Sequence, residues 1–342
     1  MNYQIGNVLD VLPTLAAGRF RCCVTSPPYW GLRDYGHPDQ LGLEPTPEEY
    51  VESMVGVFRE VRRTLTDDGT LWLNVGDSYA GSGRGGYVGG ESGLVGTVAG
   101  QHNSRAAKAA QKARSRAGFH SSAVDAGAAG RRWTPAPDGL KPKDLVGIPW
   151  MLAFALRADG WYLRSDIIWA KPSPMPESVT DRPTRAHEYV FLLSKSASYF
   201  YNGNAIAERA VSTRRSGNRE RRSRDGAGGI LGDGRHQKTH VPWADVGGTR
   251  NARSVWPIAA QPFGGAHFAT MPPDLAERCV LAGSRIGDEV LDPFLGSGTT
   301  GMVAERNGRR WFGVELQPDY EPIIRQRTAQ AGLLVAAAGA IA

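Results

Sequence analysis

The residues best suited to chemistry stand near the N-terminus, in the segment Ser26-Pro27-Pro28-Tyr29. A serine hydroxyl and a proline carbonyl both accept hydrogen bonds, and proline has no N–H that could compete for them. Acceptors aimed at both N–H groups of a conjugated amine localise the nitrogen lone pair and make the amine a better nucleophile. Tyr29 adds a ring face on which a flat heterocycle can stack. The segment therefore favours activation of a ring amine, with the rate coming from orientation and electrostatics.

A second candidate segment, Gly296-Ser297-Gly298-Thr299-Thr300-Gly301, matches the pattern G-x-G-x-x-G. Its glycines let the backbone approach a ligand closely, and the N-terminus of a following helix favours a carboxylate or a phosphate. Glu315 ends the next predicted strand, where an acid can accept hydrogen bonds from two ribose hydroxyls. The segment therefore predicts a cofactor that contains a nucleoside.

Two features favour S-adenosylmethionine over NAD as that cofactor. Asp292 precedes the glycines, and a carboxylate there suits a ligand with an ammonium group but not a pyrophosphate. Too few residues follow Glu315 to supply the remaining strands of a dinucleotide-binding sheet. Those strands must come from the N-terminal half of the chain, so the usual order of the sheet is circularly permuted. NAD remains the alternative.

Both segments follow predicted strands, over 20–25 and 289–292, so each lies at the carboxyl edge of a sheet, where open α/β folds bind ligands. Further strands are predicted over 70–75, 166–170, 188–194 and 311–315, and helices over 8–15, 47–65, 148–158, 274–282, 299–306 and 320–329. Thr46, Pro47 and Glu49 form a capping box at one helix start. The alternation predicts an α/β protein with a doubly wound, mostly parallel, Rossmann-like sheet.

The overall composition excludes several classes of protein. Hydrophobic residues make up 41% of the 342 residues, which is enough for a packed core. No uninterrupted apolar run reaches the roughly 18 residues of a membrane span. Three cysteines cannot form a disulfide framework, and the absence of CxxC and of clustered histidines predicts no metal site. The N-terminus lacks a signal-peptide pattern, so we expect a cytoplasmic protein.

Positive charge gathers in two segments of a chain whose formal net charge is +6. One segment, 213–224, is dense in arginine, and the other covers 105–116. Solvated charge on loops is one interpretation of both. Beside a motif that activates a ring amine, contact with nucleic-acid phosphates is favoured.

Together the two motifs resemble the catalytic and cofactor loops of the β-class DNA amino-methyltransferases, in which the catalytic loop comes first. The resemblance covers residues 3–78, 140–200 and 255–327, and the stretches 26–36, 160–172 and 175–179 are similar to a subgroup common in phages and bacteria. It implies a Rossmann-like enzyme that uses S-adenosylmethionine as methyl donor.

The resemblance also implies roles for individual residues. The catalytic residues are Ser26, Pro27, Pro28 and Tyr29; the cofactor-binding residues are Asn7, Thr270, Asp292, Phe294, Gly296, Ser297, Gly298, Thr299, Thr300 and Glu315; the DNA-binding residues are Lys171, Arg182, Arg214, Arg215, Arg219, Arg221 and Arg222. One position departs from the family, because Gly6-Asn7 replaces a Gly-Asp whose acid meets the adenine amine of the cofactor. Asn7 keeps an acceptor oxygen, so we expect weakened cofactor affinity at most.

The expected reaction is methyl transfer to the exocyclic amine of a base flipped out of duplex DNA. In most of the family a serine at the position of Ser26 marks cytosine N4, and Asp or Asn marks adenine N6. Cytosine N4 is therefore favoured, adenine N6 is the alternative, and a non-catalytic DNA-binding regulator on the same fold is the second alternative. Double-stranded DNA is the expected partner, no membrane is expected, and a cognate restriction enzyme and a homodimer stay open.

The chain divides into six expected regions. Residues 1–78 form the catalytic half, 79–139 a flexible Gly/Arg-rich insertion, 140–201 the continuation of the catalytic half, 202–255 the candidate target-recognition region, 256–330 the cofactor-binding half and 331–342 a frayed tail. The assignment of 202–255 depends on its position between blocks that match the family.

Overall fold

The computed structural model of the chain describes residues 2–81, 139–209, 248–261 and 270–329. Within these ranges one sheet has eight strands, in the order β1-β10-β9-β2-β3-β5-β4-β8, and a second sheet pairs β6 with β7. The strands are β1 (Tyr3–Ile5), β2 (Phe20–Thr25), β3 (Leu65–Val75), β4 (Tyr162–Ala170), β5 (His187–Ser194), β6 (Glu208–Arg209), β7 (Thr249–Arg250), β8 (Val255–Pro257), β9 (Glu289–Asp292) and β10 (Arg310–Glu315). Neighbours in the large sheet are parallel except that β5 is antiparallel to both β3 and β4. The predicted α/β class and mostly parallel sheet are confirmed.

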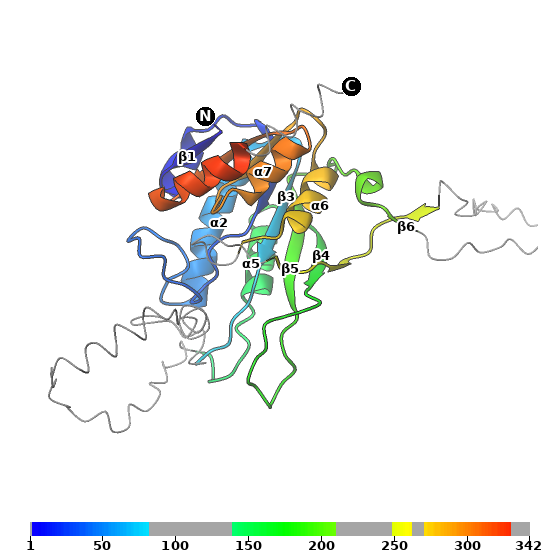
Figure 1. The fold of residues 1–342 in the computed structure, drawn as a ribbon. Helices are drawn as coiled ribbons and strands as arrows, with labels where there is room; N and C mark the ends of the chain where they lie inside the picture. Colours follow the sequence, from blue (N-terminus) through cyan, green and yellow to red (C-terminus); the bar gives the residue numbers. More distant parts are fainter. Residues whose placement is uncertain (1, 82–138, 210–247, 262–269, 330–342) are drawn as a thin grey trace, which may run out of the picture.

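Helices cover both faces of this sheet (Figure 1). They are α1 (Val8–Val11), α2 (Pro47–Thr64), α5 (Ile148–Ala158), α6 (Pro273–Gly283) and α7 (Thr299–Arg306), with a last helical stretch over 321–329. Helices α2 and α5 share a core with Cys23, whereas α6 and α7 share one with Cys22. The adjacent cysteines of β2 belong to different cores because successive side chains of a strand point to opposite faces. Of the helices in the described ranges, none is long and apolar enough to cross a membrane.

Helix α2 supports the predicted catalytic loop, residues 26–29, and begins as its sequence predicts. Thr46 Oγ1 accepts a hydrogen bond from the Glu49 N–H at 3.2 Å, and Pro47 occupies the first turn. Its buried stripe consists of Tyr50, Val51, Met54, Val57, Phe58 and Val61. Tyr50 Oη donates to the carbonyl of Pro28 at 2.9 Å, which joins this helix to the catalytic loop.

Two strands begin four or five residues earlier than predicted. β3 starts at Leu65 rather than Thr70, and its pairing with β2 jumps from Phe20–Leu65 to Cys22–Thr70, so the polar residues between them bulge out of the ladder. β4 starts at Tyr162, and its first half alternates between exposed and half-buried residues. An apolar run marks only the buried part of a strand, so the sequence pattern places both starts too late.

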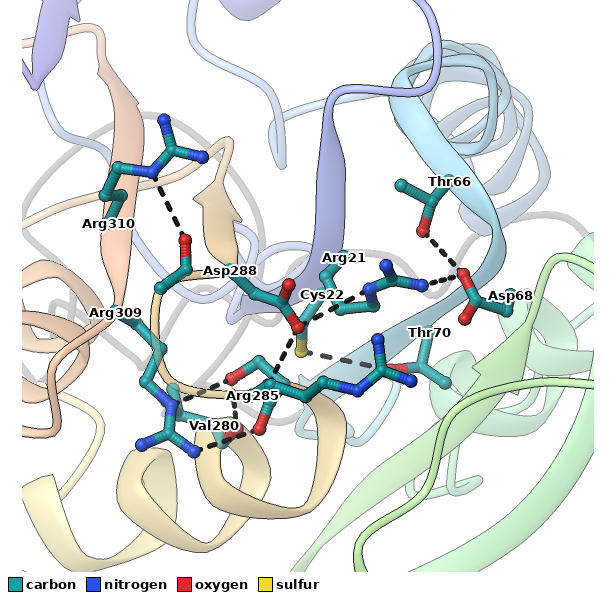
Figure 2. A network of polar contacts seen from close by, with 12 residues as sticks. Arg21, Cys22, Thr66, Asp68, Thr70, Val280, Arg285, Asp288, Arg309 and Arg310 are labelled. Atoms are coloured by element: carbon teal, nitrogen blue, oxygen red, sulfur yellow. Dashed lines mark hydrogen bonds and ion pairs between the residues drawn. The ribbon is translucent and has the colours of Figure 1, made fainter.

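A polar network joins the central strands at their amino ends (Figure 2). The guanidinium of Arg21, in β2, pairs with Asp68 in β3 and lies 3.4 Å from Asp288 Oδ2, just before β9. Arg309, just before β10, donates to the carbonyl of Ser284 at 2.9 Å. These contacts fix the sheet at the end opposite to the one where both candidate segments lie.

Candidate active site

The two segments predicted to do chemistry meet in one cavity of about 770 Å³. It opens at the carboxyl ends of β2 and β9, which are adjacent and parallel. The predicted residues that line it are Asn7, Ser26, Pro27, Pro28, Tyr29, Lys171, Thr270, Asp292, Phe294, Gly296, Ser297, Thr299, Thr300 and Glu315. Gly298 and Arg182 are outside the lining, and the predicted arginines Arg214, Arg215, Arg219, Arg221 and Arg222 lie outside the described residues.

Asp292 places a buried carboxylate at the end of β9, four positions before Gly296. Its side chain is 5% exposed, and Oδ1 accepts hydrogen bonds from Thr25 Oγ1 at 2.7 Å and from the Phe294 N–H at 3.1 Å. Burial raises the pKa of Asp292 to about 6 despite these donors. Within the part of the chain that the structure describes, no cationic side chain lowers the pKa of Asp292, and an ammonium group of a ligand would provide that compensating charge.

Glu315 is held at the end of β10 by the backbone around it. Its Oε2 accepts from the Gly296 N–H at 2.7 Å and its Oε1 accepts from the Gln317 N–H at 2.8 Å. Burial raises the pKa of Glu315 as well. Because each carboxylate oxygen has more than one lone pair, both can still accept a hydrogen bond from a hydroxyl of a ribose.

The glycine-rich segment needs its glycines for two reasons. Gly296 and Gly298 have φ of +53° and +80°, in the left-handed region that favours glycine. A Cβ on Gly301 would lie 2.7 Å from the Trp311 ring, so the third glycine allows α7 to pack against β10. Gly298 therefore shapes the turn without lining the cavity.

Asn7 has a second task besides the one implied by the resemblance. Its Oδ1 accepts a hydrogen bond from the Leu9 N–H at 2.9 Å and caps α1. Asn7 still lines the cavity, next to Glu315, whose carbonyl accepts from the Gly6 N–H at 2.8 Å. The acceptor oxygen expected to meet an adenine amine is thus shared with a helix cap.

The catalytic loop is fixed by a polar cluster that the sequence did not predict. Tyr29 Oη donates to Glu188 Oε2 at 2.7 Å and accepts from Asn74 Nδ2 at 2.6 Å. Ser26 Oγ donates to Tyr29 Oη at 3.3 Å. A Cβ on Gly76 would lie 2.5 Å from the Tyr29 ring, so the ring packs directly on the backbone after β3.

The two predicted DNA contacts in the described ranges both have partners within the chain. Lys171 pairs with Glu188 Oε1, and its ammonium lies 4.4 Å from the centre of the Trp169 ring. Arg182 pairs with Glu177 at 2.6 Å. Lys171 therefore lines the same cavity as the two predicted segments, whereas Arg182 lies outside its lining.

Arg327 supports the cofactor segment and, like Asn74 and Glu188, was not predicted from the sequence. It lies in the helical stretch 321–329, donates to the carbonyl of Ser297 at 3.2 Å and to Thr299 Oγ1 at 2.9 Å, and also contacts Ser297 Oγ. Asn74 is a polar residue within the apolar run of β3, and this departure from the pattern could have pointed to it. Nothing local in the sequence marks Glu188 or Arg327.

These residues fit S-adenosylmethionine. The buried carboxylate of Asp292 suits its ammonium group, the oxygens of Glu315 suit its ribose, and the glycine turn permits close approach. The same cavity holds the acceptor and the aromatic ring of the catalytic loop. The arrangement can bring a ring amine next to the methyl donor.

Comparisons with known proteins agree with this geometry. A family model described as DNA methylase, for enzymes of the N6/N4 type, matches residues 20–326. The type II methyltransferase M.Cfr9I of Citrobacter freundii is 44% identical over 94% of this chain and 85% of its own length. M.SmaI of Serratia marcescens, also a type II methyltransferase, is 42% identical over 94% of this chain and 89% of its own.

Two solved structures share the fold. The PvuII DNA methyltransferase, described as cytosine-N4-specific, aligns with a TM-score of 0.56 and 17% identity over 95% of this chain and 85% of its own. A protein from Thermus thermophilus described as a DNA modification methylase was solved in complex with S-adenosylmethionine. It aligns with a TM-score of 0.52 and 24% identity over 96% of this chain and 93% of its own. At these identities the likeness concerns the arrangement of strands and helices.

Proposed function

Because the chain belongs to the N6/N4 family of DNA methylases, we propose that it methylates the exocyclic N4 amine of cytosine in duplex DNA. S-adenosylmethionine is the cofactor of this family and supplies an electrophilic methyl group. One observation carries the proposal: Ser26 and Tyr29 line the same cavity as Asp292 and Glu315. An amine presented to the loop therefore lies beside the cofactor site.

The chain's own residues do three things in this reaction. Asp292 and Glu315 hold the cofactor by its ammonium and ribose groups. Ser26 and the carbonyl of Pro27 accept hydrogen bonds from the amine and orient its lone pair, while Tyr29 stacks on the ring of the base. The base must leave the helical stack to reach this cavity, as in other enzymes that act on a base.

The choice of cytosine N4 depends on Ser26. A serine at this position marks cytosine N4 in most of the family that the motif resembles. Its hydroxyl donates to Tyr29, which leaves lone pairs on the same oxygen for an amine N–H. Adenine N6 presents the same kind of amine and is the second candidate, because a serine can accept from either base.

The test is to incubate the purified protein with labelled S-adenosylmethionine and mixed-sequence duplex DNA, and then to identify the methylated nucleoside by mass spectrometry. N4-methylcytosine is the expected product. N6-methyladenine would keep the enzyme class and overturn the assigned base. DNA without label would favour a regulator on the same fold, and a Ser26→Ala, Tyr29→Ala variant serves as the inactive control.

A further inference from the structure

A line of hydrogen bonds leads from Ser26 to a carboxylate inside the cavity. Ser26 Oγ donates to Tyr29 Oη at 3.3 Å, and Tyr29 Oη donates to Glu188 Oε2 at 2.7 Å. The other oxygen of Glu188 pairs with Lys171. All four side chains line the cavity, so the line begins where the amine is expected and ends on an acid.

Asn74 fixes the direction of this line. Its Nδ2 donates to Tyr29 Oη at 2.6 Å and to Glu188 Oε2 at 3.0 Å. A carboxylate can only accept, so the single hydroxyl hydrogen of Tyr29 points to Glu188. The hydrogen of Ser26 then points to Tyr29, which leaves the lone pairs of Ser26 Oγ for an amine.

The three groups differ in their ability to keep a proton. Tyr29 is neutral at ordinary pH, because the pKa of its hydroxyl lies well above its usual range. Burial is the main cause, and the negative charge of the neighbouring Glu188 adds to it. A protonated serine or tyrosine hydroxyl is a strong acid and passes its extra proton on. Glu188 is the group on this line that can retain one.

We propose that Glu188 receives, through Tyr29 and Ser26, the proton that the target amine loses on methylation. The inference rests on the proposed function. When the amine forms its bond to the methyl carbon, the carbon–sulfur bond of the donor breaks and its electron pair stays on sulfur. The amine then carries one proton more than the neutral product.

Each step of the relay conserves protons. The amine N–H bond breaks and its proton goes to Ser26 Oγ, while the Ser26 proton moves to Tyr29 Oη and the Tyr29 proton moves to Glu188 Oε2. Both hydroxyls end neutral, and Glu188 ends as a carboxylic acid. Lys171 keeps the carboxylate paired before the reaction, and the proton leaves to solvent after it. Glu188 is therefore a positioning residue that acts through Tyr29.

The test is a double-mutant cycle on the single-turnover rate of methyl transfer to DNA. Glu188→Gln keeps an oxygen that can accept from Tyr29 but cannot bind a proton, and Tyr29→Phe keeps the stacking ring but removes the relay. We expect each variant to slow transfer at least tenfold and the double variant to be no slower than the slower single one. Effects that multiply, or a wild-type rate in either single variant, would overturn the relay.

The chain offers a matched control pair and two further readouts. Tyr3 donates to Glu321 at 3.2 Å outside the cavity lining, so Tyr3→Phe and Glu321→Gln should leave the transfer rate unchanged. In the cofactor-free protein, Glu188→Gln should shift the ζ-carbon resonance of Tyr29, whereas Glu321→Gln should not; an unshifted resonance would contradict the hydrogen bond itself.

The second readout covers the case in which Glu188→Gln does not fold. Heavy water should slow the wild type, and Tyr29→Phe should lose this solvent isotope effect; an effect that persists would overturn the relay. The wild-type product separates the two claims. If the wild type methylates a DNA amine and Glu188→Gln and Tyr29→Phe transfer the methyl group at the same rate, the relay alone is contradicted. If the wild type methylates no DNA amine, both the proposed function and the relay are contradicted.

Discussion

Thr25 and Asp292 connect the catalytic and cofactor segments by a hydrogen bond of 2.7 Å from Thr25 Oγ1 to Asp292 Oδ1. Thr25 ends β2 immediately before Ser26, and Asp292 ends β9, four positions before Gly296. The two residues are far apart in sequence and adjacent in the parallel sheet. The bond therefore orients the buried carboxylate from the strand that carries the catalytic loop.

Thr25→Val tests this connection, because it keeps the shape of the side chain and removes the donor. We expect the affinity for S-adenosylmethionine, measured by calorimetry, to fall about tenfold, since a hydrogen bond to a charged group contributes on the order of 1.5–3 kcal/mol. Thr66→Val is the control: Thr66 donates to Asp68 at 3.0 Å at the amino ends of the strands. Equal affinities in the two variants would show that the bond does not orient Asp292.

The raised pKa of Asp292 predicts a dependence of stability on pH. Burial raises the pKa to about 6, from roughly 3.9 in an unfolded chain. The fold then favours the protonated acid, so this contribution to stability is complete below pH 4 and is lost as the pH rises through 6. Between pH 4 and pH 8 the wild type should therefore lose about 2–3 kcal/mol of its free energy of unfolding relative to the Asp292→Asn variant, whose amide does not titrate.

Denaturant unfolding of both proteins across this range measures the effect. Saturating S-adenosylmethionine should abolish the advantage of Asp292→Asn at pH 8, because the cofactor's ammonium then pairs with the wild-type carboxylate. The affinity of the wild type for the cofactor should also fall as the pH drops below 6. A difference in stability that does not change with pH would contradict the assignment.

The catalytic loop and its supports differ in how far the sequence could reveal them. Thr46, Pro47 and the stripe of α2 follow local rules of capping and periodicity, so that helix was predictable. Glu188 meets Tyr29 across 159 positions, and only the antiparallel pairing of β5 with β3 brings them together. Local pattern predicts that a strand exists, but neither its direction nor its register. The acid that supports Tyr29, a predicted catalytic residue, therefore had to be found in the structure.

Gly76→Ala should disturb catalysis without affecting the cofactor site. Its Cβ would lie 2.5 Å from the Tyr29 ring, so the ring must move out of its hydrogen bonds with Asn74 and Glu188. We expect the single-turnover rate of methyl transfer to fall at least tenfold while S-adenosylmethionine binds with unchanged affinity.

Gly56→Ala is the matched control for that substitution. Gly56 lies in α2, and a Cβ there meets no atom within 4 Å. Alanine should stabilise the helix by about 0.5–1 kcal/mol and leave the transfer rate unchanged. If Gly76→Ala turned over at the wild-type rate, the position of the Tyr29 ring would not matter for the reaction.

We expect the candidate target-recognition region, 202–255, to contact DNA phosphates. Its two ends lie together, since β6 pairs with β7 and Glu208 Oε2 accepts from Arg250 at 3.1 Å and from Arg253 at 2.9 Å. The arginines between these ends are the predicted contacts. Replacing Arg214, Arg215, Arg219, Arg221 and Arg222 by glutamine should weaken DNA binding and flatten the plot of log affinity against log salt concentration.

The slope of that plot should change by about 0.9 for each phosphate that no longer meets a cationic side chain. Binding is measured by fluorescence anisotropy with duplex DNA at several salt concentrations. The control is the variant in which the same five arginines are replaced by lysine, because it keeps the charge and should keep the slope. If the glutamine variant kept the wild-type slope, these arginines would make no phosphate contacts, and the binding energy would have to come from other residues.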